Sequence, residues 1–395
     1  MINRIKFLLI IFVFGAVGCT QHNSDVISEQ VSDIGKKNIP DKRLMYWDID
    51  LEIKDGQTTL KGATASENSF NDLKSLAEQK SIGFDIELLP TDEFKANPWG
   101  IVTLSVCNIR REGTHSAELL SQALMGTPVK VYTKVDGWYL IQTPDRYFGW
   151  VDATAIALKT NAELVEWKNM DKVLYNRQNG WAFSSASDKS AVECDLVLAD
   201  LLSISASEKE YHKILLADGR EVFVKKEECI SLDIWKNKNV SVPKILETAF
   251  GFKGLPYLWG GTSAKMTDCS GFTKSVYYFN GILLQRDASQ QTFYGELVDT
   301  ENGYENLQAG DLVFFGRNAT DEQDERVTHV GLCTGNQEFI HASGRVRINS
   351  LNKESDKYKE HYKTAFVRAR RVIGNVNGQG IEWIVDNEFY KEILP

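Results

Sequence analysis

Residues 99–157 consist of short extended segments separated by turn-forming residues, and this pattern restricts the fold more than any other feature of the chain. Regularly spaced short strands joined by such turns are typical of a small β-barrel. Residues 158–235 repeat the pattern more faintly, with a turn signal at Asp218-Gly219. The sequence therefore predicts two consecutive all-β units. The turn signals of the first lie at Gly113, Gly126, Asp136-Gly137 and Pro144-Asp145.

The wording ALMGTPVKVYTKVDGWYLIQTPDRYFGWVD within the first unit resembles the bacterial SH3-like domains that accompany cell-wall enzymes. The resemblance implies an SH3-like barrel over residues 99–157. The segments DKVLYN and YHKILLADGREVFVKKEECI show the same pattern of short extended segments. We therefore predict a second SH3-like barrel over residues 158–235.

Residues 1–19 have the layout of a secretory signal, because basic residues precede an apolar run at 7–14 that is too short to span a bilayer. The closing AVGC resembles the lipobox of bacterial lipoproteins, which implies that Cys19 becomes a lipid-modified N-terminus. An ordinary signal with an incidental cysteine is the alternative. Residues 20–40 are polar and are predicted to form a flexible tether. We expect a cell-envelope protein, lipid-anchored to a membrane as a periplasmic or outer-membrane lipoprotein.

Residues 41–98 mix extended and helical patterns. Residues 43–54 alternate apolar and polar side chains, Asp55-Gly56 marks a turn, and TTLKGATA is again extended. Ser69–Gln79 has the spacing of an amphipathic helix, and FDIELLP reads as a strand. This segment is predicted to be a small α/β domain, and it carries no cluster of catalytic side chains.

Residues 236–375 change to a mixed pattern in which helices come first. PKILETAFGF reads as a helix, and a second helix begins at Cys269 and ends at Gly281. Alternating segments then predict strands at DLVFFG, THVGLCTG, QEFIHAS and RVRINS. Helices followed by an antiparallel sheet indicate an α+β domain. The whole chain is predicted to be multidomain α+β, with residues 376–395 left as an unassigned C-terminal tail.

Cys269, His329 and His341 are the residues best suited to catalysis. Imidazole can lower the pKa of a thiol and carry its proton to a leaving amine, and the N-terminus of a helix favours both the thiolate and an oxyanion. A hairpin turn centred on Gly335 would place the two histidines directly opposite each other on one face. We assign Cys269 as nucleophile, His329 as base and His341 as the residue that orients it.

Other interpretations of these residues remain open at this point. Cys269 could be a small buried residue, and a metal site is a weak alternative because no CxxC or HxxxH motif is present. Cys107 and Cys333 lie in apolar runs and are expected to be buried thiols. Whether Cys194 and Cys229 form a disulfide after export cannot be decided from their spacing.

Residues 242–372 resemble the NlpC-type cysteine peptidase family of bacterial cell-wall endopeptidases. The matching sequence motifs are PYLWGG, DCSGF, RDASQQ, AGDLVFF, THVGLCTG and FIHASG. The resemblance implies a papain-like core in which Cys269 attacks an amide, His329 is the base and His341 orients it. No cofactor and no metal is implied.

The order of domains is similar to that of γ-D-glutamyl-L-diamino acid endopeptidases, which act on short peptides with a free N-terminal L-Ala. In that subgroup the first SH3-like domain closes the cleft beyond the second substrate residue. The resemblance carries four residues over to the substrate pocket, Tyr257, Asp268, Ser270 and Ser289. An ammonium ligand is expected at Asp268, for which an N-cap role is the alternative. Glu118 and Tyr147 are our own placement over the cleft, and their alternatives are a solvated acid for Glu118 and a barrel core residue for Tyr147.

Three functions are compatible with the sequence. The leading one is a cysteine peptidase that hydrolyses the γ-D-Glu–L-diamino acid bond of peptidoglycan-derived peptides during muropeptide recycling. The alternatives are a hydrolase of intact polymeric peptidoglycan targeted by the SH3-like domains, and a noncatalytic muropeptide-binding lipoprotein. The net charge of −9 argues against a nucleic-acid partner. A monomer is expected.

Overall fold

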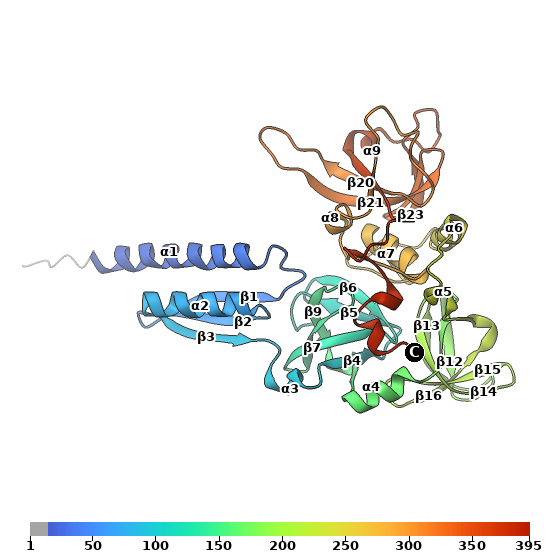
Figure 1. Ribbon diagram of the computed structural model, residues 1–395, viewed down its shortest axis with the longest axis horizontal. Coiled ribbons are helices and arrows are strands. Elements are labelled where there is room, and N and C mark those ends of the chain that lie inside the picture. The colour runs from blue at the N-terminus through green and yellow to red at the C-terminus, as the bar shows by residue number, and fades with distance from the viewer. Residues whose placement is uncertain (1–14) are drawn as a thin grey trace, which may run out of the picture. The chain divides into compact units, whose positions relative to one another are not determined.

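The computed structural model describes the backbone of residues 15–395 and the side chains from residue 24 onward. The chain divides into two compact units, Met1–Thr91 and Asp92–Pro395 (Figure 1). The predicted signal segment, residues 1–19, falls largely outside the described residues, and so does the side chain of Cys19. Its lipidation therefore stays a prediction.

The first unit is a small α/β structure. Its elements are α1 (Gly15–Asn38), β1 (Trp47–Lys54), β2 (Gln57–Thr64), α2 (Glu67–Lys80) and β3 (Gly83–Leu88). β1 and β2 are antiparallel, and β3 runs parallel to β2 after the crossover through α2. The side chain of Ser66 caps α2 by accepting a hydrogen bond from the backbone N–H of Ser69 at 3.2 Å. The predicted amphipathic helix and strands are thus present.

The predicted flexible tether is wrong, because α1 covers most of residues 20–40. Ile27, Val31 and Ile34 recur at helical spacing. Ile27 is buried, and Val31 and Ile34 pack against the cluster formed by Leu60, Leu73, Ala77 and Ile86. Burial of this apolar stripe stabilises a helix whose remaining residues are polar. The i, i+4, i+7 spacing of these residues indicates a helix, although the overall composition of the segment is polar.

The second unit begins with a seven-stranded barrel. Its elements are α3 (Asp92–Lys95), β4 (Trp99–Val102), β5 (Val106–Arg110), β6 (Leu119–Leu124), β7 (Pro128–Val135), β8 (Trp138–Gln142), β9 (Phe148–Asp152), η1 (Ala153–Ala155) and β10 (Ile156–Leu158). The strand order is β10-β4-β7-β8-β9-β5-β6. Phe94 of α3 packs into the barrel core, so residues 92–98 belong to the barrel and the boundary predicted after residue 98 is too late.

A second seven-stranded sheet follows. Its elements are α4 (Asn161–Lys168), β11 (Lys172–Tyr175), β12 (Asn179–Phe183), β13 (Val192–Val197), β14 (Leu201–Glu208), β15 (Tyr211–Leu215), β16 (Glu221–Lys225), η2 (Lys226–Glu228) and β17 (Cys229–Ser231). The order β17-β11-β14-β15-β16-β12-β13 repeats the first barrel strand for strand. Cys194 and Cys229 pack against the core of this sheet as free thiols, so no disulfide joins them.

The remainder of the unit is an α+β domain. Its elements are α5 (Asp233–Lys236), α6 (Val242–Gly251), α7 (Cys269–Phe279), β18 (Ile282–Leu284), α8 (Ala288–Gln291), β19 (Glu296–Val298), β20 (Leu312–Arg317), β21 (Arg326–Gly335), β22 (Glu338–Ser343), β23 (Arg345–Ser350), α9 (Glu360–Ala365) and β24 (Phe366–Arg371). The sheet order is β19-β24-β20-β21-β22-β23. All four predicted strands and both predicted helices are present.

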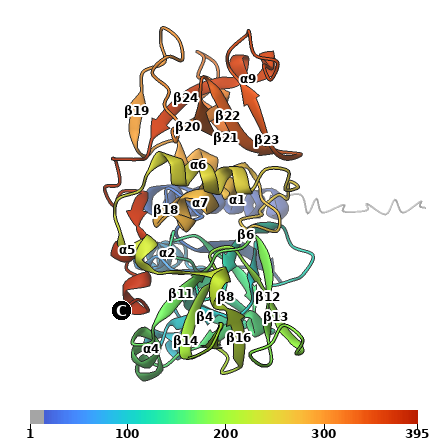
Figure 2. The same ribbon diagram turned by 90° about the vertical axis from the view of Figure 1, so that its right-hand side faces the viewer.

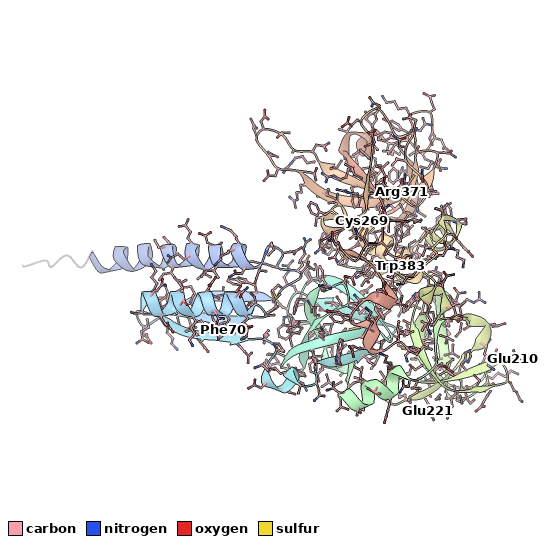
Figure 3. The ribbon with its side chains drawn as sticks, in the orientation of Figure 1. Phe70, Glu210, Glu221, Cys269, Arg371 and Trp383 are labelled. Carbon is pink, nitrogen blue, oxygen red and sulfur yellow. The ribbon has the colours of Figure 1, made fainter. Side chains whose placement is uncertain are left out.

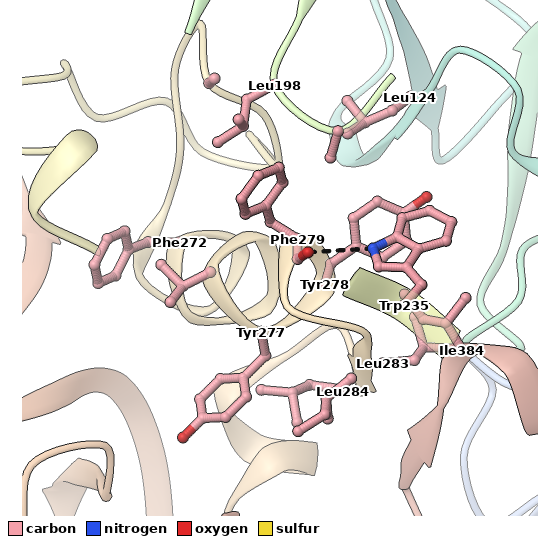
Figure 4. Packing of buried hydrophobic residues seen from close by; sticks show 14 of the residues in the cluster. Leu124, Leu198, Trp235, Phe272, Tyr277, Tyr278, Phe279, Leu283, Leu284 and Ile384 are labelled. Atoms are coloured by element: carbon pink, nitrogen blue, oxygen red, sulfur yellow. Dashed lines mark hydrogen bonds between the residues drawn. The ribbon is translucent and has the colours of Figure 1, made fainter. Parts of the chain in front are cut away.

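α7 is the central helix of the second unit, and every one of its residues is buried. It lies between the β20–β24 sheet and the two barrels (Figure 1 and Figure 2). One hydrophobic cluster joins α7 to Leu124 of the first barrel and Leu198 beside the second. Trp235 closes the cluster and donates from Nε1 to the carbonyl of Phe279 at 3.2 Å (Figure 4). The barrels and the α+β domain therefore share a core.

Residues 376–395 are part of that core, although the sequence left them unassigned. They form β25 (Ile381–Trp383), η3 (Ile384–Asp386) and η4 (Tyr390–Glu392). β25 pairs with β18, and Phe389 and Tyr390 are fully buried. Asn387 donates to the carbonyl of Pro144 in the first barrel at 3.0 Å. Among the helices within the described range, none is both long and apolar enough to cross a bilayer.

Candidate active site

Cys269 is the first residue of α7, as the sequence predicted, and it lies near the centre of the second unit (Figure 3). Asp268 is the N-cap, and its Oδ1 accepts the backbone N–H of Gly271 at 2.7 Å. Only 8% of Cys269 is exposed, and the residue belongs to the shared hydrophobic cluster. The backbone N–H groups of Val330 and Ser270 are directed at its sulfur. The thiol is thus held next to the strand that carries His329.

Asp268 is paired with Arg286, whose side chain is 1% exposed. Arg286 donates from Nη2 to Oδ2 of Asp268 at 2.5 Å and from Nη1 to Oδ1 at 3.2 Å. The second oxygen of Asp268 also accepts the backbone N–H of Gly260 at 3.0 Å, and Ser270 Oγ receives Arg286 Nη1 at 3.0 Å. Both carboxylate oxygens are therefore occupied by protein donors.

This geometry does not support the expectation that Asp268 binds a substrate ammonium. The buried guanidinium already offsets the carboxylate charge, and the N-cap interaction uses the oxygen nearest the helix. Arg286 lies in the RDASQQ motif, but the resemblance to the family assigned it no role. The sequence did contain a signal for this pair, since an arginine next to apolar residues is rarely buried without a carboxylate partner.

His329 on β21 and His341 on β22 form a hydrogen-bonded pair, with Nε2 of His329 2.8 Å from Nδ1 of His341. His341 Nε2 lies 2.9 Å from Oδ1 of Asn349 on β23, and Asn349 Nδ2 donates to the carbonyl of Lys357 at 2.9 Å. That last bond sets the amide orientation, so His341 donates from Nε2 and accepts at Nδ1. His329 then donates from Nε2, which leaves its Nδ1 lone pair as a proton acceptor.

Asn349 was not identified from the sequence. Its position is set by the pairing of β22 with β23, where Arg347 faces His341 and Asn349 lies two residues farther on the same face. The asparagine keeps His341 in one tautomer and one orientation. Sequence spacing alone cannot reveal it, because the register of β23 depends on the tertiary fold.

The hairpin between the two histidines differs from the prediction. Its turn residues are Asn336 and Gln337, both with positive φ, and the register pairs Leu332 with Ile340. The turn is thus centred between residues 336 and 337 rather than on Gly335, and His329 is not directly opposite His341. That register places Gly331 across from His341, and His329 shares its face because side chains alternate with period two. The rings still meet, along a diagonal.

Aromatic side chains enclose the histidine pair. Tyr362 on α9 stacks on His329 with ring centroids 6.0 Å apart, and it meets His341 edge-on at 5.0 Å. Burial lowers the pKa of His329 to about 3 and that of His341 to about 4. The neighbouring imidazole, His361 and Arg347 lower the pKa of His329 further. Both imidazoles are therefore neutral at physiological pH.

The thiol behaves in the opposite way to the sequence expectation. Burial raises the pKa of Cys269 to about 12, and the charge of Asp268 adds to the increase. Backbone N–H groups and Arg286 lower the pKa, as expected for a helix N-terminus, but the desolvation of the sulfur is the larger effect. The resting pair is thus a neutral thiol beside a neutral imidazole, and the proton must move during attack.

Two further residues predicted to bind substrate, Tyr257 and Ser289, come from the segments before and after α7. Tyr257 is half-buried, and burial raises the pKa of its hydroxyl, with smaller contributions from Cys269 and Asp268, so the hydroxyl stays a donor. Ser289 is in α8, where Asp287 rather than Ser289 is the N-cap. Of these two residues, Tyr257 therefore lies near the thiol.

Glu118 and Tyr147 approach from the first barrel. Glu118 accepts from Arg111 at 2.5 Å and from Trp259 Nε1 at 2.8 Å. Tyr147 is buried and donates its hydroxyl to Asp287 at 3.2 Å. The two residues therefore bridge the barrel to the segments on either side of Cys269, and Glu118 keeps 38% of its side chain exposed.

Comparison with known proteins agrees with this geometry. Residues 254–371 match the NlpC/P60 family, and this range contains α7 and the histidine hairpin. Residues 109–156 match the bacterial dipeptidyl-peptidase SH3 domain and lie within the first barrel. Both resemblances noted in the sequence are confirmed.

Individual relatives extend the match. The γ-D-glutamyl-L-lysine dipeptidyl-peptidase of Bacillus cereus (strain ATCC 10987 / NRS 248) is 30% identical over 64% of this chain and 76% of its own length. The murein DD-endopeptidase MepS/murein LD-carboxypeptidase of Escherichia coli K12 is 32% identical over 45% of this chain and 87% of its own length. The crystal structure of an NlpC/P60 family protein from Bacillus cereus ATCC 10987 shares the fold, with a TM-score of 0.57 over 70% of this chain and 99% of that one at 24% identity. The sequence relatives and the matched domain together show that the chain belongs to the NlpC/P60 family and is a peptidase.

Proposed function

We propose that this peptidase hydrolyses the γ-D-Glu–L-diamino acid bond of short peptidoglycan-derived peptides that begin with a free L-Ala. The observation that carries the proposal is the attachment of the first barrel to the loop before Cys269. Trp259 donates to Glu118, and the backbone N–H of Thr262 donates to Gln122 at 2.9 Å. A substrate chain that extended beyond two residues on this side would meet β6. The Bacillus relative named for γ-D-glutamyl-L-lysine dipeptide release supports the same bond.

Buried contacts make this attachment rigid. Arg286 Nε donates to Ser121 Oγ of the first barrel at 3.1 Å, and Lys274 of α7 forms a buried ion pair with Asp145. Since these bonds link the barrel to the helix of the nucleophile, the barrel acts as a fixed wall of the cleft. Free peptides released from the wall fit such a site better than a cross-linked polymer, which is why we assign a role in muropeptide recycling.

The proposed reaction uses the neutral pair directly. Cys269 attacks the γ-carbonyl carbon while its proton passes to Nδ1 of His329, and the oxyanion is bound by N–H groups at the start of α7. His329 then gives the proton to the leaving α-amine as the C–N bond breaks. Water, deprotonated by the same imidazole, hydrolyses the thioester and restores the thiol. His341 and Asn349 hold the base in the required tautomer.

The test compares L-Ala-γ-D-Glu-diaminopimelate with its N-acetylated form. We expect purified protein to release L-Ala-γ-D-Glu from the free tripeptide, and kcat/KM for the acetylated peptide to fall by roughly a hundredfold because acetylation removes the charge of the terminal amine and its charge-assisted hydrogen bonds. Glu118→Gln should reduce this discrimination, whereas Glu112→Gln, an exposed barrel carboxylate, should leave it unchanged. Equal turnover of both peptides would contradict the proposal.

A hydrolase of intact wall is the second candidate, and the murein endopeptidase relative favours it. Such an enzyme would release fragments from purified sacculi and would be indifferent to N-acetylation. Activity on sacculi together with no turnover of the free tripeptide would therefore select this candidate over the first.

The pH dependence of kcat/KM follows from the lowered pKa of His329. With a pKa of about 3 the imidazole remains a base at pH 5, so we expect kcat/KM to change by less than about twofold between pH 7 and pH 5. A histidine with the ordinary pKa of 6.5 would lose roughly 25-fold over that range. An acid limb near pH 6.5 would contradict the buried, neutral base.

This measurement needs a stability control. A histidine whose pKa is lowered by folding binds its proton more readily in the unfolded chain, so His329 and His341 destabilise the fold as the pH falls below about 6.5. Assays at each pH should therefore be returned to pH 7 to verify that the loss of activity is reversible.

We further propose that lipidation at Cys19 holds the enzyme in the cell envelope. The lipobox resemblance of AVGC supports this location, where peptides from the wall are available.

A further inference from the structure

A pocket of about 410 Å³ is lined in part by His329, and no residue of the first barrel lines it. This volume is within the range of ligand sites, roughly 300–1,000 Å³. No carboxylate lines it, although the whole chain carries a net charge of −9. The lining residues are Phe315, Gly316, Arg317, Arg326, Thr328, His329, Ser343, His361, Tyr362 and Ala365.

Two arginines of this pocket face each other. Arg317 ends β20 and Arg326 begins β21, and the sheet register pairs them directly. Like charges at directly opposed positions of an antiparallel pair destabilise it, so the arrangement calls for an anion between them. Glu325, the acid next in sequence, is instead bound to Arg368.

Neither arginine forms an ion pair among the residues the structure describes. Arg317 donates only to the backbone carbonyl of Asp324, at 3.1 Å, and both side chains are exposed. Arginine presents a planar set of donors that matches a carboxylate in a bidentate manner. His361, whose imidazole can donate a hydrogen bond, also lines the pocket.

The chemistry of the proposed reaction indicates which part of the substrate occupies this pocket. His329 must protonate the leaving α-amine, so the diamino acid occupies the side of the cleft that His329 lines. Resting on the proposed function, we propose that this pocket binds the leaving diamino acid and that Arg326 and Arg317 bind the carboxylate at the end of its side chain. Diaminopimelate carries that second carboxylate. Lysine carries only an ammonium there, which two guanidinium groups repel.

The chain should therefore prefer diaminopimelate over lysine at this position. The preference is a property of these two arginines rather than of the bond that is cleaved. The Bacillus relative is named for a lysine-containing substrate, so the pocket would distinguish this chain within its family.

The experiment compares three tripeptides, L-Ala-γ-D-Glu followed by meso-diaminopimelate, by L-lysine, or by diaminopimelate with an amidated side-chain carboxylate. We expect kcat/KM to favour the first by roughly tenfold to a hundredfold, as for a charge-assisted hydrogen bond gained or lost. The amidated peptide should behave like the lysine peptide. Arg326→Gln should remove most of the preference by slowing the first substrate selectively, and Arg317→Gln should act in the same direction.

Lys244→Gln on α6 is the matched control, because it removes the same charge from an exposed position outside the pocket. It should leave the ratio of the two rates unchanged. Equal rates for diaminopimelate and lysine peptides, or an equal loss on both in Arg326→Gln, would overturn the inference while leaving the proposed function intact. Turnover of none of the three peptides would instead contradict the proposed function. Thermal unfolding of each variant verifies that the pocket is still folded.

Discussion

Cys269→Ala is expected to lower kcat for the free tripeptide by at least roughly four orders of magnitude. The thiol forms the covalent bond in the proposed reaction, and removal of a nucleophile from such a site costs most of the catalytic rate. The side chain is small and buried, so alanine should leave the fold of α7 in place. Release of L-Ala-γ-D-Glu, followed by chromatography over several hours, measures the residual rate.

Cys333→Ala provides the matched control. This thiol is 1% exposed and packs on β21 in a cluster separate from that of Cys269. The control variant should retain nearly full activity with a modest loss of stability. If Cys269→Ala retained more than about one hundredth of the wild-type rate, the thiol would not be the nucleophile.

Arg286→Met is expected to reduce the free energy of unfolding by about 3–5 kcal/mol, because it leaves Asp268 as a buried carboxylate without its cation. The two groups are 1% and 9% exposed, so solvent screens neither. The substitution should also slow catalysis. Asp268 raises the pKa of Cys269 and Arg286 lowers it, so losing the guanidinium makes deprotonation of the thiol harder. Urea unfolding and the pH dependence of thiol alkylation measure the two effects.

Two further variants isolate the cause. Asp268→Asn in the Arg286→Met background should recover part of the stability, since asparagine can still cap α7 and no uncompensated charge remains. Arg220→Met removes the cation from the exposed Arg220–Asp218 pair of the second barrel and should cost at most about 1 kcal/mol. A similar loss of unfolding free energy in Arg286→Met and Arg220→Met would show that the buried Arg286–Asp268 pair is not the cause of the destabilisation.

The elements that carry the site were predictable from local patterns. The helix from Cys269 and the strands of His329 and His341 were predicted from helical and extended sequence patterns, and the structure contains all three. Residues 20–40 were mispredicted because composition was weighed above the spacing of Ile27, Val31 and Ile34. These apolar residues stabilise a helix only when the folded unit provides a hydrophobic cluster for them to pack against.

The residues that pair with the site residues were harder to predict from the sequence. Arg286 contacts a residue 18 positions before it and Asn349 a residue 8 positions before it, and both pairings depend on which helices and strands become neighbours. The position of Asp268 beside Cys269 suggested a ligand for an amine, but Arg286 and two backbone N–H groups occupy both of its oxygens. A carboxylate's role depends on its donors, which adjacency in sequence does not reveal.

The residue types of the thiol–imidazole site, the helix that begins at the thiol and the SH3-like barrel before it could all be read from the chain, because they are encoded by local periodicity and short motifs. Folding decided the protonation of the site, since the pKa values of Cys269 and His329 are set mainly by desolvation. Cys269 is desolvated in the core that the two barrels and the α+β domain share, and His329 lies against Phe315 and Tyr362. Folding also brought Arg317 opposite Arg326, which depends on strand register. Burial and register arise from contacts between distant segments, so no single segment of the sequence contains them.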